Sequence, residues 1–96
     1  MTDLVQDYID RLTPKVRGTL RGTAKLVIRD EGTVMLDETG ARVGDDAADV
    51  VLIASDPVFR NILSGDQNPV TAFMSGKLKV EGNPQRALKV SAILTG

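Results

Sequence analysis

Three asparagine–proline or aspartate–proline pairs punctuate the second half of this 96-residue chain, at positions 56–57, 68–69 and 83–84. A side-chain oxygen of Asp or Asn can accept hydrogen bonds from the free amides at a helix start, and proline fits the first helical position because no donor is needed there. Apolar residues at helical spacing follow each pair. The pairs therefore predict three helices, which end at Gly65, at Gly76 and near Leu94.

The opening segment predicts a fourth helix. Its apolar residues between Leu4 and Leu12 recur at a helical spacing and form one stripe. Asp3 is the expected N-cap, with Gln6 three residues later to complete a capping box. Pro14 is the expected end of this helix, because proline removes a backbone donor and clashes with the preceding turn.

Five short segments have the patterns of β-strands. A tight turn that ends at Gly32 joins the first two strands into a hairpin, and the third is a short edge strand. The fourth is consecutively apolar from Val50 to Ile53, so we expect a central strand covered on both faces. In the fifth, Leu78 and Val80 alternate with charged residues and turn inward. The expected strands are residues 22–29, 33–37, 41–43, 49–54 and 77–81.

Together these elements predict an α+β fold in one domain over residues 1–96. We expect a mixed, mostly antiparallel five-stranded sheet with helices packed on one face. The two helices before the last strand form a connection long enough for a parallel pair, although they do not require one. On the last helix the expected inward stripe is Ala87, Leu88, Ser91 and Leu94.

The residue types limit the chemistry that the chain can perform. It has no cysteine and no histidine, which removes thiolate and imidazole metal ligands and the commonest acid–base catalyst near neutral pH. Ser75, Gly76 and Lys77 lack the spacing of a phosphate-binding P-loop and are turn residues in our interpretation. Asp45, Asp46 and Asp49 are interpreted as a solvated acidic turn rather than a cation site. We therefore expect no catalysis, no cofactor and no metal.

Charge is divided unevenly although the formal net charge is −1. Residues 11–29 hold six bases and no acids, and residues 30–49 hold seven acids and one base. The basic block is either a patch for phosphate head groups, coenzyme A or an anionic membrane, or a solvated strand face opposed by acids of neighbouring strands. Nucleic acid is not an expected partner, because three aromatic residues cannot form a stacking platform. A secretory signal and a long apolar segment are both missing from the sequence, so we expect a cytoplasmic protein.

The last three helices carry more large apolar residues than are needed to cover one sheet face. An ordinary packed core and a flexible aliphatic cavity are both compatible with this surplus. The residues in question are Phe59, Ile62, Leu63, Phe73, Met74, Leu88 and Leu94.

Several short motifs between Ala48 and Leu94 resemble, in their order and spacing, the family of sterol carrier protein 2. They are Leu63-Ser64-Gly65, Ala72-Phe73 after Pro69, Ser75-Gly76-Lys77-Leu78-Lys79-Val80, Gly82-Asn83 and Ala87-Leu88-Lys89. The resemblance implies a non-catalytic lipid carrier with a tunnel between sheet and helices for a fatty acid, fatty acyl-coenzyme A, sterol or similar ligand. Transient membrane contact and a homodimer are compatible with it. The alternative is an interaction, dimerisation or accessory module, for example in quinone biosynthesis or attached to a larger lipid-related enzyme.

The resemblance and the helical stripes together give a set of residues expected to line a lipid cavity. They are Phe59, Ile62, Leu63, Phe73, Met74, Leu78, Val80, Leu88, Ser91 and Leu94.

Overall fold

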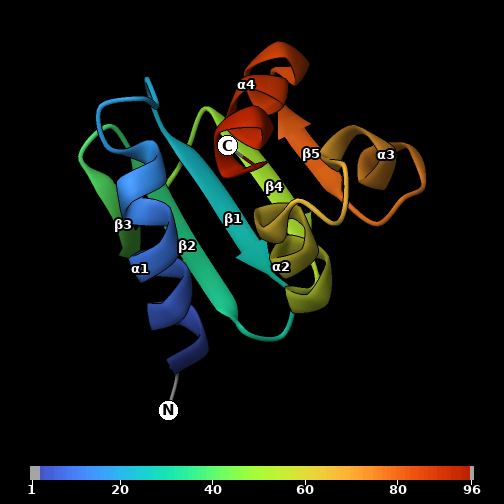
Figure 1. The fold of residues 1–96 in the computed structure, drawn as a ribbon. Coiled ribbons are helices and arrows are strands. Elements are labelled where there is room, and N and C mark those ends of the chain that lie inside the picture. Colours follow the sequence, from blue (N-terminus) through green and yellow to red (C-terminus); the bar gives the residue numbers. More distant parts are fainter. Residues whose placement is uncertain (1–2, 96) are drawn as a thin grey trace.

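A computed structural model describes residues 3–95, with the side chains of residues 4–95. Its five strands form one sheet in the order β3-β2-β1-β4-β5, and its four helices lie on one face of that sheet (Figure 1). This confirms the α+β class and the five-stranded mixed sheet. In chain order the elements are α1 (Asp3–Val16), β1 (Ala24–Ile28), β2 (Gly32–Asp37), β3 (Gly40–Val43), β4 (Val50–Ala54), α2 (Asp56–Ser64), α3 (Pro69–Met74), β5 (Lys79–Gly82) and α4 (Pro84–Thr95).

The sheet contains three antiparallel pairs and one parallel pair. β1 and β2 form the predicted hairpin, β3 pairs antiparallel with β2 at one edge, and β5 pairs antiparallel with β4 at the other. β1 and β4 are parallel, so Leu26 lies between Val34 and Leu52 of its two neighbours. The parallel pair therefore joins β4 to the first strand, and the helical connection between β4 and β5 produces an antiparallel pair.

β4 departs from the prediction in two respects. The middle strand of the sheet is β1, and β4 lies beside it. Val51 and Ile53 are only half-buried, since they alternate with the buried residues of β4 and therefore face away from the helices. The helices cover only one face of the sheet (Figure 1). A run of apolar residues thus marked an interior strand correctly, but its expected burial on both faces was wrong.

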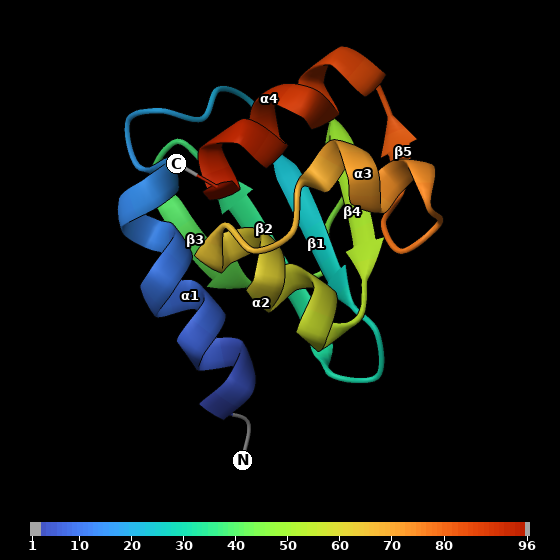
Figure 2. The ribbon, with the colours of Figure 1, turned by 45° about the vertical axis from the view of Figure 1, so that its right-hand side comes forward.

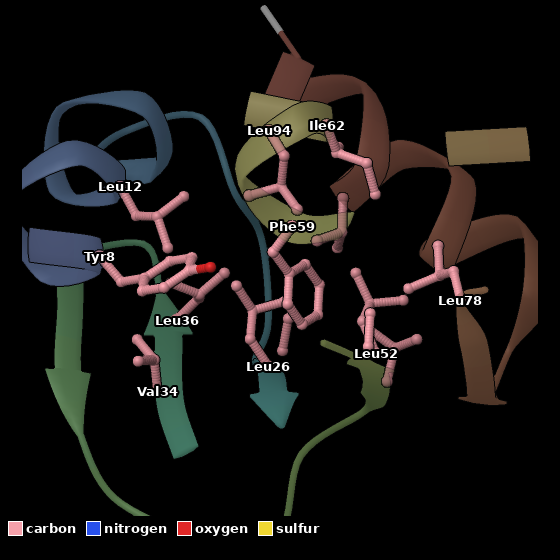
Figure 3. Packing of buried hydrophobic residues seen from close by; sticks show 14 of the residues in the cluster. Tyr8, Leu12, Leu26, Val34, Leu36, Leu52, Phe59, Ile62, Leu78 and Leu94 are labelled. Carbon is pink, nitrogen blue, oxygen red and sulfur yellow. The ribbon is translucent and has the colours of Figure 1, made fainter. Parts of the chain in front are cut away.

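The core fills the space between the sheet and the helices (Figure 3). Tyr8 of α1 and Phe59 of α2 meet edge to face, with ring centroids 6.3 Å apart and planes at 82°. Leu26 and Leu52 come up from the sheet beneath Phe59, and both are 1% exposed or less. The strand alternation that the sequence predicts therefore places one face of β1 and β4 in this core.

α1 continues past the proline at which we expected it to end. Pro14 cannot donate to the preceding turn, but Arg17 N donates to Thr13 O at 3.0 Å and the helix reaches Val16. A proline inside a helix costs about 3 kcal/mol, whereas burying a valine returns roughly 1.5–3 kcal/mol. Since Val16 is 0% exposed, its burial offsets much of the cost of Pro14.

The expected capping box at the start of α1 rests on Asp3, whose side chain lies outside the described residues. Its other member, Gln6, donates from Nε2 to Asp10 Oδ1 at 3.0 Å, one turn further along the helix.

Two of the three proline pairs cap their helices as predicted. Asn68 Oδ1 accepts from Val70 N at 2.8 Å, and Asn83 Oδ1 accepts from Gln85 N at 2.8 Å. The prediction for Asp56 is wrong, because Ser55 occupies the N-cap position of α2. The Asp56 carboxylate is instead engaged by side chains from outside the first turn of α2, as described below.

Candidate functional site

A groove with a volume of about 280 Å³ lies where α3, β5 and α4 meet. The Asn68 cap starts α3, and Gly76, with a φ of 83°, turns the chain after it toward β5. The alternation of the following residues then aims Leu78 and Val80 at the helices. The lining residues are Pro69, Val70, Phe73, Met74, Leu78, Val80, Pro84, Ala87, Leu88 and Ser91.

The groove has a buried floor and an exposed apolar rim. Leu78 is 2% exposed at the floor, while Phe73 and Leu88 at the rim are 53% and 54% exposed. Met74, at the end of α3, is 80% exposed. Large apolar side chains left in water around a hollow are the ordinary signature of a surface that another apolar body covers.

Ser91 is the one polar side chain among the lining residues that the structure describes. It is 5% exposed, so its hydroxyl lies at the floor rather than at the rim. No ionisable side chain lines this groove in the described part of the chain. Contacts here are therefore dispersion and apolar burial, with one hydroxyl available for a hydrogen bond.

The structure divides the predicted cavity residues into two groups. One group lines the groove: Phe73, Met74, Leu78, Val80, Leu88 and Ser91. The other packs in the core: Phe59, Ile62 and Leu94 are each 1% exposed, and Leu63 is a partly buried neighbour of the core. Sequence periodicity could not separate them, because a core face and a groove wall have the same helical spacing.

Four lining residues were missing from the predicted set. Val70 lies one helical turn before Phe73 and Met74, so their shared face was visible in the sequence. Pro69 and Pro84 were assigned only to helix starts, although their rings also present apolar surface to the groove. Ala87 was placed on the inward stripe of the last helix, but it was not assigned to the cavity.

The inward stripe of α4 also needs one correction. Val90 is buried at 3% exposure, whereas Leu88 is 54% exposed. In an α-helix of 3.6 residues per turn, successive residues are rotated by about 100°. Leu88 therefore lies to one side of the line through Ala87, Ser91 and Leu94, and this rotation carries it to the rim of the groove.

A polar network ties α1 to α2 beside the core. The Tyr8 hydroxyl donates to Asp56 Oδ1 at 2.7 Å, and Arg60 Nε donates to the same oxygen at 2.7 Å. Arg60 also donates to Asp7 Oδ2 at 2.8 Å, and its guanidinium carbon lies 5.2 Å from the Tyr8 ring centroid. Burial of the Tyr8 hydroxyl and its hydrogen bond to Asp56 raise the pKa of Tyr8 above its ordinary value. The hydrogen bonds of Arg60 to Asp56 and Asp7 raise its pKa as well.

Ser75, Asp45 and Asp46, which could suggest other chemistry, have structural partners. Ser75 Oγ donates to Ala72 O at 3.2 Å, at the end of α3. Asp45 Oδ1 accepts from Lys25 Nζ at 2.9 Å, which pairs the acidic block with one member of the basic block. Asp46 pairs with Arg42 at 3.3 Å. Within residues 3–95, no group of three acidic, histidine or cysteine side chains is arranged to hold a metal ion.

None of the four described helices is both long and apolar enough to cross a bilayer.

Comparison with known proteins places the chain in a family. A sequence profile of the SCP-2 sterol transfer family matches residues 6–95. Hydroxysteroid dehydrogenase-like protein 2 of Mus musculus is 42% identical over 72 residues, which cover 69% of this chain but 15% of that protein. A fatty acid-binding protein of Yarrowia lipolytica is 43% identical over 47 residues, which cover 49% of this chain and 36% of that protein.

A solved structure shows the same fold over nearly the whole chain. It is sterol carrier protein 2 of Aedes aegypti in complex with palmitate, with a TM-score of 0.79 and 16% identity, covering 98% of this chain and 96% of that one. At this identity the likeness concerns the fold alone. The profile match over residues 6–95 carries the assignment, and the chain belongs to the SCP-2 sterol transfer family.

Proposed function

We propose that the protein is a non-catalytic lipid carrier that binds an apolar ligand, such as a fatty acid, fatty acyl-coenzyme A or sterol, in the groove between α3, β5 and α4. The observation that carries this proposal is the combination of an apolar lining with a rim left in water, at Phe73, Met74 and Leu88. The family assignment and the palmitate complex of the Aedes aegypti protein support it.

Apolar burial supplies the affinity in this proposal. Each buried methylene contributes roughly 0.8 kcal/mol. Micromolar binding requires about 8 kcal/mol and association itself costs at least about 4 kcal/mol, so on the order of fifteen methylenes must be buried against Phe73, Leu78, Leu88 and their neighbours. The Ser91 hydroxyl can meet one polar atom of the ligand at the floor. A non-catalytic role fits a lining whose described residues include no acid, base or charged electrophile.

The size of the groove bears on how a long ligand fits. Its volume of about 280 Å³ lies just below the usual range of ligand pockets, roughly 300–1,000 Å³. A whole acyl chain or sterol therefore requires the groove to widen. In this proposal α3 moves away from α4 and β5 to widen the groove, because it has only six residues and buries only Ala72.

A deeper tunnel between sheet and helices is a further part of the proposal. Phe59, Ile62 and Leu94 fill that space and would have to change rotamer to admit an acyl chain. The acyl chain would then make apolar contacts in place of those that the three side chains lose. Binding would therefore offset part of the free energy needed to open the tunnel.

Native mass spectrometry of the protein purified from cells, followed by titration with a fluorescent fatty acid, tests the carrier function. We expect a co-purified lipid mass or saturable uptake. Leu88→Gln should weaken uptake about tenfold, because it places an amide at the rim of the site. Val43→Gln is the matched control, since Val43 is 66% exposed on β3 at the opposite edge of the sheet. Lipid-free protein that takes up no fatty acid contradicts the proposal.

A second candidate is an interaction or accessory module, and two observations favour it. The chain spans only 15% of the Mus musculus relative, and its exposed apolar rim could pack against a further domain or a second copy. Sedimentation equilibrium over a range of concentrations separates the candidates. A stable dimer that Leu88→Gln dissociates supports the module, whereas a monomer that takes up fatty acid supports the carrier.

A further inference from the structure

A second hollow lies on the other side of α4 from the apolar groove. It has a volume of about 410 Å³ and is lined by residues of α4 and of the loop that joins α1 to β1. Figure 2 shows this loop beside α4. The two hollows share no lining residue, because the groove takes Leu88 and Ser91 from α4 while this cleft takes Arg86, Lys89 and Val90. This second hollow, the cationic cleft, is lined by Thr19, Leu20, Arg21, Thr23, Arg86, Lys89, Val90, Ala92 and Ile93.

Arg86 fixes the shape of the cationic cleft. Its Nη2 donates to Arg21 O at 2.5 Å and lies 3.6 Å from Asp49 Oδ2. Asp49 in turn accepts from Thr23 N at 3.2 Å. Gly22 has a φ of 77°, and any side chain there would collide with Arg86 and Asp49. The loop is thereby held against α4, and the walls of the cleft are preformed.

The charges in the cleft have one sign. All three of its charged lining residues, Arg21, Arg86 and Lys89, are cations. Asp49 balances part of the charge of Arg86 but does not line the cleft. Since the chain as a whole has a formal net charge of −1, this is a local concentration of positive charge.

The remaining walls combine a hydroxyl donor with an apolar floor. Thr19 lies on the loop side, and Leu20 and Val90 are 4% and 3% exposed beneath the opening. Guanidinium groups match phosphate oxygens in a forked geometry, and a lysine adds a point charge. Because the floor is apolar, an organic phosphate with a hydrocarbon group should bind more tightly than inorganic phosphate.

We propose that the cationic cleft binds the phosphate group of a phosphate ester, with the organic part of the ester against Leu20 and Val90. The anion lies among Arg21, Arg86 and Lys89. The site does not depend on the carrier function, because it uses the opposite side of α4 from the groove. The ester is either a lipid head group or a soluble phosphate ester, and the experiment distinguishes these two sources.

The test is an amide NMR titration of the full chain with inorganic phosphate, glycerol phosphate and dihexanoyl phosphatidic acid below its micelle concentration. We expect saturable shifts at residues 19–23 and 86–90, strongest with the phosphatidic acid. The double variant Arg21→Gln, Lys89→Gln should weaken binding about tenfold or more, since it removes two charge-assisted contacts. Both side chains are exposed, so the fold should not depend on them.

Lys77→Gln, Lys79→Gln is the matched control, with the same loss of charge at exposed positions outside the cleft. It should leave the affinity within about twofold, since surface charges far from a bound ion are screened. Equal losses in both double variants would show unspecific attraction and overturn the site. So would the lack of saturable shifts in the cleft with any of the three phosphates. Shifts confined to Phe73 and Leu88 would also overturn it, while leaving the carrier function standing.

Vesicles identify the source of the ester. Co-sedimentation with phosphatidylcholine vesicles that contain phosphatidic acid, lost in Arg21→Gln, Lys89→Gln, assigns the cleft to a lipid head group. Binding of the short-chain ester without vesicle association assigns it to a soluble phosphate ester. Either result supports the phosphate chemistry of the cleft.

Discussion

α1 and α3 both carry apolar residues on one face, yet they bury them to opposite extents. The stripe of α1 is closed off, with Tyr8, Leu12 and Val16 at 1% exposure or less. On α3, Phe73 and Met74 are 53% and 80% exposed. α1 has 14 residues and packs across β2 and β3, whereas α3 has six residues and lies beside α4 and the edge strand β5. One half of the molecule is packed for stability, and the other leaves apolar surface available for a ligand or partner.

The sharpest test of this difference compares the same substitution in both halves. Leu12→Ala removes a fully buried side chain and should lower the free energy of unfolding by about 2–5 kcal/mol. Leu88→Ala removes a side chain that is 54% exposed and should cost less than about 1 kcal/mol. Urea unfolding followed by circular dichroism measures both. If Leu88→Ala costs as much as Leu12→Ala, the groove is a closed core and the comparison fails.

The next largest effect concerns the network that holds α2 against α1. Asp56→Ala removes the carboxylate that accepts from Tyr8 and Arg60, and we expect a loss of about 1–2 kcal/mol. Tyr8 keeps a contact to Asp56 O at 3.2 Å, which limits the loss. Asp46→Ala is the control, because its pair with Arg42 is largely exposed and should contribute less than about 0.5 kcal/mol. Equal effects of the two variants would mean that the network is an ordinary surface ion pair.

The same network makes the stability of the packed half depend on pH in the alkaline range. Burial and the hydrogen bond to Asp56 raise the pKa of Tyr8 above its unfolded value of about 10. The folded state therefore holds the phenol proton where the unfolded chain has lost it. The stabilisation is complete below pH ~10 and declines as pH rises further, by at most about 1.4 kcal/mol per pH unit.

Urea unfolding of the wild type and Tyr8→Phe above pH ~10 isolates this contribution, since phenylalanine lacks the proton that titrates. Tyr8 is the one tyrosine in the chain, so tyrosinate absorbance reports its ionisation directly. The variant should lose less stability with rising pH than the wild type. Parallel declines in the two proteins would mean that the Tyr8 hydroxyl is not protected.

Local signals in the sequence predicted much of the fold. The hairpin of β1 and β2, the edge position of β3 and the starts of α3 and α4 follow from turn and cap residues that act within a few positions. Three features that the sequence did not specify have distant causes. Val16 finds a buried place that extends α1 past Pro14, Tyr8 of α1 donates to Asp56 of α2, and β4 pairs in parallel with β1. Such partners cannot be read from neighbouring residues.

Prediction of the groove from the sequence was limited in the same way. The alternation of residues correctly predicted that Leu78 and Val80 face inward. Helical spacing could not predict that Phe59 is enclosed in the core while Phe73 lies at the rim of the groove. The difference depends on what covers each helix. α2 lies over the middle of the sheet, and α3 lies near its edge (Figure 2).

The substitution with the smallest expected effect on stability is the most informative about the half of the molecule that leaves apolar surface exposed. Met74 is 80% exposed, so Met74→Gln should change the free energy of unfolding by no more than about 0.5 kcal/mol. The same substitution should weaken fatty acid uptake, because the side chain loses water only when a ligand covers it. Hydrogen exchange should agree, with faster exchange in α3 than in α1 and slowing of α3 when the fatty acid is added. A destabilised Met74→Gln protein with unchanged uptake would mean that α3 supports the fold and has no part in binding.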